Sequence, residues 1–274
     1  QNALECTQPR RIEVLDDFDD HRHVESLQTV VPIDQRADRL VRANRDSARL
    51  ARLFEVDDEA ELDMLRVLEA TLAQAGALAE AVAVAGAGGE VFPLFMAGGW
   101  FTRDHLPKQL AAAGGAAWRL LDPFGLDAGV QSLTVTLARE AAIAAGQPPQ
   151  DLHLLLAAHG SFRSPAPSEV ASAMAARIKT DLDFASVQAA FIDQSPQIAD
   201  VAATLPPGSI VLPFFAARGG HVIDDLPQAL DEAAFEGMLL QPVGLDCRVP
   251  ALIAADATAR VVGPNGQRDV PVVL

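Results

Sequence analysis

The sequence is poor in several residue types on which particular classes of protein depend. It has no tyrosine and only two cysteines, Cys6 and Cys247, too few for a disulfide framework or a four-thiolate metal site. No apolar run approaches the roughly 18 residues of a membrane span, and no basic segment followed by an apolar one indicates a secretory signal. These absences predict a soluble, cytoplasmic protein with no membrane partner.

Basic residues are also scarce. The 21 Lys and Arg face 37 Asp and Glu, which gives a formal net charge of −16, and lysine occurs only at positions 108 and 179. Because phosphate binding requires clustered basic side chains, this balance argues against a nucleic-acid partner. It is compatible with a small anionic ligand, since a local basic rim can override the overall field.

The chain contains an internal repeat. Shifted by 120 positions, residues 70–110 match residues 190–230 without a gap, with 14 identities in 41 positions. After a slip of one residue, "LLDPFGLD" at 120–127 falls on "LLQPVGLD" at 239–246. At 274 residues, half of them hydrophobic, the chain is long enough for two domains that each have a core. The repeat therefore predicts an N-terminal extension at 1–26, a first domain at 27–148 and a second domain at 149–274.

The first 69 residues differ from the rest, since they contain no glycine but 17 acidic residues and 10 arginines. We expect the first strand of domain one at 26–33 and a charged amphipathic helix at 33–55. In the extension, the acidic residues and the pair His21 and His23 would either bind a metal or form a solvated acidic surface, and the second reading is favoured.

Short apolar segments alternate with helical patterns in the second copy. Strands are expected at 152–161, 187–192, 209–215 and 237–245, with helices at 168–180, 197–205 and 224–234. This alternation predicts an α/β fold in which each domain is a small parallel sheet with helices on both faces. Functional groups in such sheets gather at the carboxyl ends of the strands.

That rule brings three side chains to one edge of the second sheet. His159 ends the first strand, Asp193 ends the second, and His221 lies in the loop after the third. Two imidazoles and a carboxylate suit a divalent first-row metal, and they suit equally well the role of proton acceptor near pH 7. Spacing alone does not separate these roles from that of a histidine in a turn or in the core.

The segments "LLLAAHGSFRSP" at 154–165 and "IVLPFFAARGGHVIDDLPQAL" at 210–230 resemble class II chelatases, the sirohydrochlorin chelatase family that inserts cobalt or iron into sirohydrochlorin. The resemblance is carried by an ordered set of residues, namely His159, Gly160 and Ser161, then Phe191, Asp193 and Pro196, then Pro213, Phe215, Gly220, His221, Val222, Asp225, Leu226 and Pro227. It covers residues 150–250 well and residues 67–135 in weakened form.

The resemblance implies two tandem chelatase-like domains with a cleft between them. It also implies metal insertion, in which two pyrrole protons leave while M²⁺ arrives from one face of the ring, in cobalamin or siroheme biosynthesis. His159, His221 and Asp193 would be the catalytic and metal-binding residues, with Asp193 either orienting a histidine or joining the metal shell. Family members usually carry Glu where this chain has Asp193. The divalent metal (Co²⁺, Fe²⁺ or Ni²⁺) would be a substrate, and no permanently bound cofactor is expected.

The same resemblance suggests which residues contact a polycarboxylate tetrapyrrole. The candidates are Ser161, Arg163, Arg218, Gly219, Gly220, Phe215, Trp100 and Phe101. The arginines would pair with carboxylates, the glycines would let backbone approach a flat ligand, and the aromatic side chains would line the cleft or stack on the macrocycle. Each arginine is equally interpretable as an ordinary surface residue, and the aromatic side chains as packing residues.

The first copy lacks this chemistry. Phe101 stands at the position of His221, Ala73 stands at that of Asp193, and no His-Gly-Ser occurs near residues 25–45. We therefore expect one active centre, carried by the second domain, with the first domain as a lid and cleft wall. Two fused copies also predict a monomer. The alternatives are a carrier or regulator that binds metal or tetrapyrrole without turnover, and an unrelated two-lobed ligand-binding protein.

Overall fold

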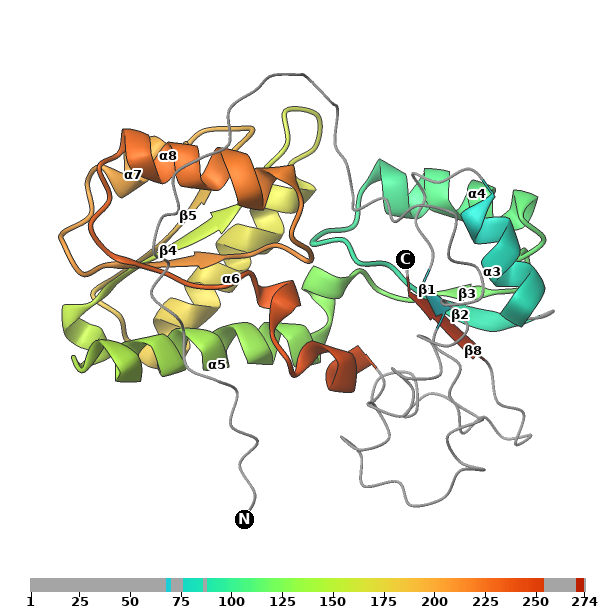
Figure 1. Cartoon of the computed structure of the whole chain (residues 1–274), viewed down its shortest axis with the longest axis horizontal. Coiled ribbons are helices and arrows are strands. Elements are labelled where there is room, and N and C mark those ends of the chain that lie inside the picture. Colours follow the sequence, from blue (N-terminus) through green and yellow to red (C-terminus); the bar gives the residue numbers. More distant parts are fainter. Residues whose placement is uncertain (1–67, 70–75, 86–87, 254–269, 274) are drawn as a thin grey trace, which may run out of the picture.

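The computed structural model describes residues 68–69, 76–85, 88–253 and 270–273 (Figure 1). The expected extension, the strand at 26–33 and the helix at 33–55 lie outside these residues. Within them, the chain forms two four-stranded sheets in separate lobes, and every strand pairing is parallel. The predicted α/β fold with parallel sheets and flanking helices is confirmed.

The first sheet has the strand order β1-β8-β2-β3. Its strands are β1 (Leu68–Glu69), β8 (Val270–Val273), β2 (Gly89–Phe92) and β3 (Arg119–Leu120). The accompanying helical elements are α3 (Ala77–Ala85), a π-helix (Phe101–His105), α4 (Leu106–Ala112) and a 3₁₀ turn (Phe124–Leu126).

The second sheet has the order β5-β4-β6-β7. Its strands are β4 (His153–Ala158), β5 (Ser186–Phe191), β6 (Ile210–Pro213) and β7 (Met238–Leu239). The helical elements are α5 (Ala128–Ala145), a 3₁₀ turn (Pro149–Asp151), α6 (Ala166–Leu182), α7 (Ile198–Ala202), a π-helix (His221–Asp225), α8 (Leu226–Glu232) and a 3₁₀ turn (Val243–Leu245). Helix α6 begins two residues before the predicted Ser168, whose hydroxyl instead donates to the Pro165 carbonyl.

Strand β4 shows why the second sheet is covered on both faces. From Leu154 to Ala158 its residues are apolar and buried, so both faces need partners. Because side chains alternate along a strand, Leu154 and Leu156 point into the cluster formed with α5 and α6. Leu155 and Ala157 point the other way, into the cluster formed with α7 and α8. The sheet is thus the middle layer of three.

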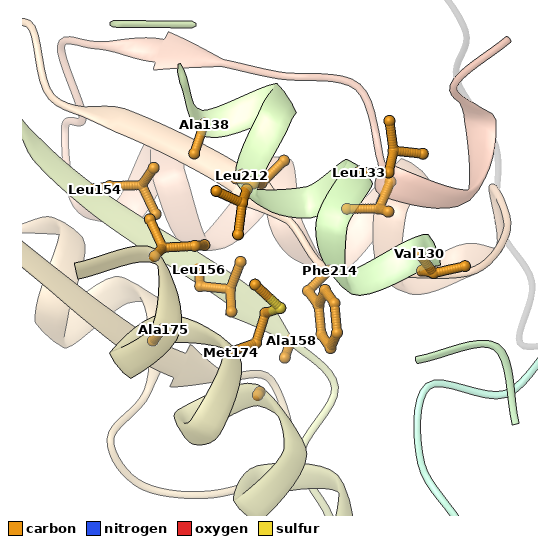
Figure 2. Close-up of a cluster of buried hydrophobic side chains, with 14 of the residues drawn as sticks. Val130, Leu133, Ala138, Leu154, Leu156, Ala158, Met174, Ala175, Leu212 and Phe214 are labelled. Carbon is orange, nitrogen blue, oxygen red and sulfur yellow. The ribbon is translucent and has the colours of Figure 1, made fainter. Parts of the chain in front are cut away.

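Helix α5 precedes the predicted domain boundary but packs on the second sheet. Figure 2 shows Val130, Leu133 and Ala138 of this helix in one hydrophobic cluster with Leu154 and Leu212 of the sheet. The helix is well delimited, because the Asp127 side chain accepts a hydrogen bond from the Val130 N–H and Gly146 ends it in a left-handed conformation.

Strand β8 follows the predicted domain boundary but belongs to the first sheet. Our division of the chain assigns residues 270–273 to the second domain, whereas β8 pairs with β1 and β2 of the first sheet. Figure 1 shows this chain-end strand, in red, among the blue-green elements of the other lobe. Comparison of the two strand orders places β8 where the second sheet has β4. Four residues have no local signal that names their partner strands, so only the folded chain reveals this exchange.

The two lobes otherwise repeat one another as the sequence predicts. The two π-helices and the α-helices that follow them, α4 and α8, are offset by 120 positions. Gly125 and Gly244, which correspond after the one-residue slip, both lie so close to the preceding loop that a Cβ would overlap the carbonyl oxygen of Met96 or Ala216. The repeat therefore extends to the close contacts that position the loops before each π-helix.

Candidate functional site

The carboxyl edge of the second sheet holds the three residues that the sequence singles out. His159 directly follows β4, Asp193 lies two residues after β5, and His221 opens the π-helix after β6. The Asp193 N–H donates to the His159 carbonyl at 2.9 Å, so the parallel pairing of β4 and β5 continues into the two loops. The register of the sheet thus sets how the two side chains meet.

The side chains come together at this edge. The rings of His159 and His221 lie edge to face, with centroids 4.3 Å apart and planes at 87°. Asp193 Oδ2 lies 3.6 Å from His159 Nε2. The side chains of His159, Asp193 and His221 are 43%, 35% and 40% exposed, so a ligand can reach all three. The predicted convergence of these residues is therefore present in the folded chain.

The backbone of the His-Gly-Ser turn is held by the neighbouring loop. Gly160 has φ +74°, and a Cβ there would lie 2.7 Å from Gln194 Cγ and 2.8 Å from Phe191 Cβ. Glycine is required both by the left-handed conformation and by this crowding. The Ser161 N–H donates to Gln194 Oε1 at 2.7 Å. Gln194 consequently fixes the turn that carries His159 against the loop that carries Asp193.

Both histidines have their Nδ1 atoms turned toward acceptors. Nδ1 of His159 lies 2.7 Å from the Gly160 carbonyl oxygen, and Nδ1 of His221 lies 2.5 Å from Asp225 Oδ2. A carbonyl or ionised carboxylate only accepts hydrogen bonds, so each neutral imidazole carries its proton on Nδ1. Both Nε2 lone pairs are then available to a metal ion or to a proton from a ligand.

These groups form an open edge. In the part of the chain that the structure describes, no group of three or more His, Cys, Asp or Glu residues is arranged to hold a metal ion. The 3.6 Å between His159 Nε2 and Asp193 Oδ2 is too long for a hydrogen bond. Two acceptors that face each other at this separation are a suitable place for a transient cation or proton.

The predicted substrate-binding residues of the second domain are placed unequally. Arg163 and Arg218 are exposed. A Cβ added at Gly219 would meet nothing within 4 Å, and one at Gly220 would only touch Asp224 at 3.7 Å. Phe215, in contrast, is only 7% exposed and lies in the interior, which differs from the expectation that it lines the ligand site.

Ser161 acts within its own loop. Its hydroxyl accepts a hydrogen bond from the Arg163 N–H at 3.1 Å, and its own N–H is taken by Gln194. The residue therefore shapes the turn that carries His159. A direct contact between Ser161 and a ligand stays a prediction.

An aromatic cluster occupies the matching place in the first domain. Trp100 is 67% exposed and lies over His105, with ring centroids 5.2 Å apart and planes at 30°. Phe101 lies between His105 and Phe95, with centroids 5.0 Å from each. The first copy thus has a broad aromatic surface where the second has its histidine and carboxylate.

Sequence reasoning assigned no role to four residues in the segments that form this edge, although Asp225 stood in the family motif. Asp225 and Gln194 orient the histidine-bearing segments, and Phe162 and Ile223 are apolar side chains left 81% and 52% exposed. The spacing of four between His221 and Asp225 was a readable signal, because such pairs share one helix face. The contact of Gln194 links two loops and has no local signal.

The parallel sheets, with two histidines at the carboxyl edge of the second one, are the arrangement expected of a class II chelatase. The CbiX family model matches residues 153–259. A solved structure described as CbiX, the terminal enzyme for biosynthesis of siroheme in denitrifying bacteria, is 47% identical and has a TM-score of 0.65, with 70% of this chain and 82% of that chain covered. This chain belongs to the CbiX family. The predicted resemblance to class II chelatases is confirmed.

Two more distant structures share the fold. DR2241 from Deinococcus radiodurans, a multi-domain protein described as similar in structure to chelatases, is 22% identical with a TM-score of 0.60, over 84% of this chain and 52% of that chain. SirB from Bacillus subtilis, solved with Fe³⁺, is 14% identical with a TM-score of 0.53, over 68% and 77%. No curated protein matches the chain.

None of the described helices combines the length and apolar character needed to cross a bilayer.

Proposed function

We propose that this protein inserts a divalent metal, Co²⁺ or Fe²⁺, into sirohydrochlorin or a related tetrapyrrole. The observation that carries the proposal is the pair of histidines at one sheet edge, each with Nδ1 bonded to an acceptor and Nε2 open, beside the carboxylate of Asp193. Membership of the CbiX family and the siroheme enzyme at 47% identity support the same reaction.

The reaction requires one surface to manage a metal and two protons. Insertion forms four metal–nitrogen bonds, and the two pyrrole N–H protons must leave the ring. His159 and His221 would offer Nε2 to the incoming metal or accept the pyrrole protons, and Asp193 would share a cation with His159. The close approach of the rings lets the metal and the proton acceptors face the same side of the macrocycle.

An open site fits a metal that is only passing through. A closed tetrahedral cage binds its ion as part of the fold, whereas a chelatase must release the ion to the tetrapyrrole nitrogens. The described residues provide no such cage. Two imidazoles and a carboxylate with intermediate exposure are compatible with transient binding, and cellular supply would then influence which metal is used.

Substrate binding is proposed for residues around the edge. Arg163 and Arg218 would pair with the carboxylates of the substrate, and Gly219 and Gly220 leave open space in which a flat ring can approach the backbone. Phe162, with 81% of its side chain exposed, would contact the macrocycle from the second domain. Trp100 and Phe101 would contribute an aromatic surface from the first domain, in the cleft between the domains.

We also propose the wider setting of the reaction. The second domain, residues 149–274 less β8 and with α5 added, would carry the chemistry, and the first would act as the cleft wall. The product would enter siroheme or cobalamin biosynthesis in the cytoplasm. Because two copies of the unit are fused, the protein would work as a monomer. The metal would be a substrate, and no resident cofactor would be needed.

The test is the anaerobic absorbance of sirohydrochlorin with Co²⁺ or Fe²⁺, with and without the protein. A His159→Ala/His221→Ala variant is the matched comparison, and its thermal unfolding establishes that it is folded. Acceleration by the wild type that is lost in the variant is the expected result. Equal rates for the two proteins would overturn the assigned site.

The same experiment separates turnover from binding alone. A shifted spectrum of the tetrapyrrole without faster insertion would indicate a carrier or regulator, the reading that the Asp at position 193 first suggested. In this structure the shorter side chain does reach the vicinity of His159. The expected outcome is therefore catalysis, with rates that differ between the two metals.

A further inference from the structure

Asp225 makes the shortest side-chain contact at the site. Its Oδ2 lies 2.5 Å from Nδ1 of His221, and the two residues lie at the start and the end of one π-helix. Both side chains are partly exposed, 40% for His221 and 46% for Asp225. Asp225 therefore contacts the histidine from behind its reactive nitrogen, while Nε2 stays free for a ligand.

The two histidines have different acceptors for the proton on Nδ1. In His159 the proton on Nδ1 is held by the carbonyl oxygen of Gly160, a backbone group that no substitution removes. In His221 it is held by a side chain. A ring without such a partner rotates and exchanges its proton between the two nitrogens, so the Nε2 lone pair is present only part of the time.

The first domain provides an internal comparison. Its π-helix has the same length and position, and it places Phe101 and His105, the counterparts of His221 and Asp225, in ring contact with centroids 5.0 Å apart. The fold thus brings the first and fifth residues of this helix together in both domains. The neighbouring Asp104 and Asp224 are common to both copies, whereas the carboxylate at the fifth position accompanies the histidine only in the second.

We propose that Asp225 is the positioning residue for His221, holding the imidazole in one orientation with its proton on Nδ1 so that Nε2 faces the metal and the pyrrole protons. This inference rests on the proposed chelatase function for its kinetic consequence. Its structural part, the fixed tautomer of His221, is independent of any activity. By analogy with the outer-shell partners of metal-binding histidines, loss of Asp225 should reduce kcat by about 10- to 100-fold.

Three variants separate this role from a general effect of charge. Asp225→Ala removes the acceptor, Asp225→Asn retains an oxygen that still accepts from Nδ1–H, and Asp224→Ala removes a charge from the adjacent position. The imidazole ¹⁵N chemical shifts of the metal-free protein report the tautomer of each histidine. We expect His221 to be protonated on Nδ1 in the wild type and in Asp224→Ala, to lose this preference in Asp225→Ala, and to retain it partly in Asp225→Asn.

The kinetic measurement uses sirohydrochlorin with Co²⁺. The expected result is a lower kcat in Asp225→Ala, partial recovery in Asp225→Asn, and a KM for sirohydrochlorin within about twofold of the wild type, since Asp225 lies behind the ring. Unchanged ¹⁵N shifts of His221 in Asp225→Ala would overturn the proposal, as would an equal loss of kcat in Asp224→Ala. If the wild type inserts no metal, the proposed function fails while the tautomer measurement still decides the role of Asp225.

Discussion

The imidazole rings of His159 and His221 meet edge to face, 4.3 Å apart, although one follows β4 and the other opens a π-helix after β6. Because β4 and β6 pair in parallel, their carboxyl ends lie at the same edge and deliver both rings to one place. The contacts at Nδ1 then leave both Nε2 lone pairs available to a metal ion or to a proton from a ligand. This relationship underlies the reaction that we propose.

Gly244, in the turn after β7, and Gly219, in the loop after β6, should respond differently to alanine. Gly244→Ala is expected to lower the free energy of unfolding by about 1–3 kcal/mol, because its Cβ would overlap the Ala216 carbonyl. Gly219→Ala meets nothing within 4 Å and should unfold like the wild type. If a tetrapyrrole lies against this loop, Gly219→Ala raises the KM for sirohydrochlorin. An unchanged KM would remove Gly219 from the binding surface.

The two arginines near the histidines should act on substrate affinity. Arg163→Ala and Arg218→Ala are each expected to raise the KM for sirohydrochlorin by roughly 2- to 5-fold with little change in kcat, as exposed charge pairs contribute up to about 1 kcal/mol. Added salt should reduce the difference in KM between each variant and the wild type, because it screens the charge pairs. Arg139→Ala, an exposed position on α5, is the matched control. Equal effects at all three positions would indicate overall charge instead of a local rim.

Gln194 should matter for the geometry of the His-Gly-Ser turn. Gln194→Ala leaves the Ser161 N–H without its acceptor, which we expect to cost about 1 kcal/mol of unfolding free energy and to lower kcat. The exposed Gln228 of α8 serves as the comparison, since its side chain donates to Glu232 one turn away and does not link two loops. Urea unfolding and initial rates measure the two effects. Wild-type rates in Gln194→Ala would show that the turn holds His159 without this bond.

The ion pairs of Arg248 should make stability depend on pH. Burial by itself would raise the pKa of Asp246, but the hydrogen bonds and charge of Arg248 outweigh it and hold that pKa below its ordinary value. Arg248 also forms two hydrogen bonds with Glu140 of α5, at 2.7 and 2.9 Å. A carboxylate with a lowered pKa stabilises the fold above its unfolded pKa of about 3.9 and loses that contribution as the pH falls through the folded value.

Arg248→Met is therefore expected to be less stable than the wild type by about 1 kcal/mol at pH 7, a modest figure because the Arg248 side chain is more than a third exposed. The difference should shrink below about pH 4. Urea unfolding at pH 7 and pH 3 tests this, with Arg139→Met, on the helix α5 that carries Glu140, as the control. A difference that stays constant between the two pH values would contradict the assignment.

Strand β8 should be essential to the first sheet. A chain that ends at residue 269 lacks the strand that pairs with β1 and β2, so backbone groups of both lose their partners. We expect loss of protease resistance in the first lobe, while the second sheet, which does not include β8, keeps its own. Limited proteolysis with mass spectrometry of the fragments measures this. Unchanged cleavage of the first lobe would mean that β8 adds nothing to its stability.

Much of the architecture could be read from local patterns. The apolar run of β4, the glycine after His159 and the 120-residue repeat each have a physical cause that acts within a short segment, namely burial on both faces, a left-handed turn and duplicated loop contacts. Together with the rule for parallel sheets, they were enough to predict that His159, Asp193 and His221 converge.

Other features depend on contacts between distant segments. The burial of Phe215, the bond from Ser161 to Gln194 and the packing of α5 on the second sheet carry no sequence signal, because each depends on what the rest of the chain places beside it.

The sequence by itself determined the α/β repeat, the order of strands and helices, and which side chains reach the carboxyl edge, since periodicity and strand direction are local properties. Only the tertiary structure decided that β8 occupies the position of β4 in the other sheet, and that Asp225 and not Asp193 holds Nδ1 of His221. Both outcomes are set by packing between segments, where geometry in three dimensions selects one partner among many of similar chemistry.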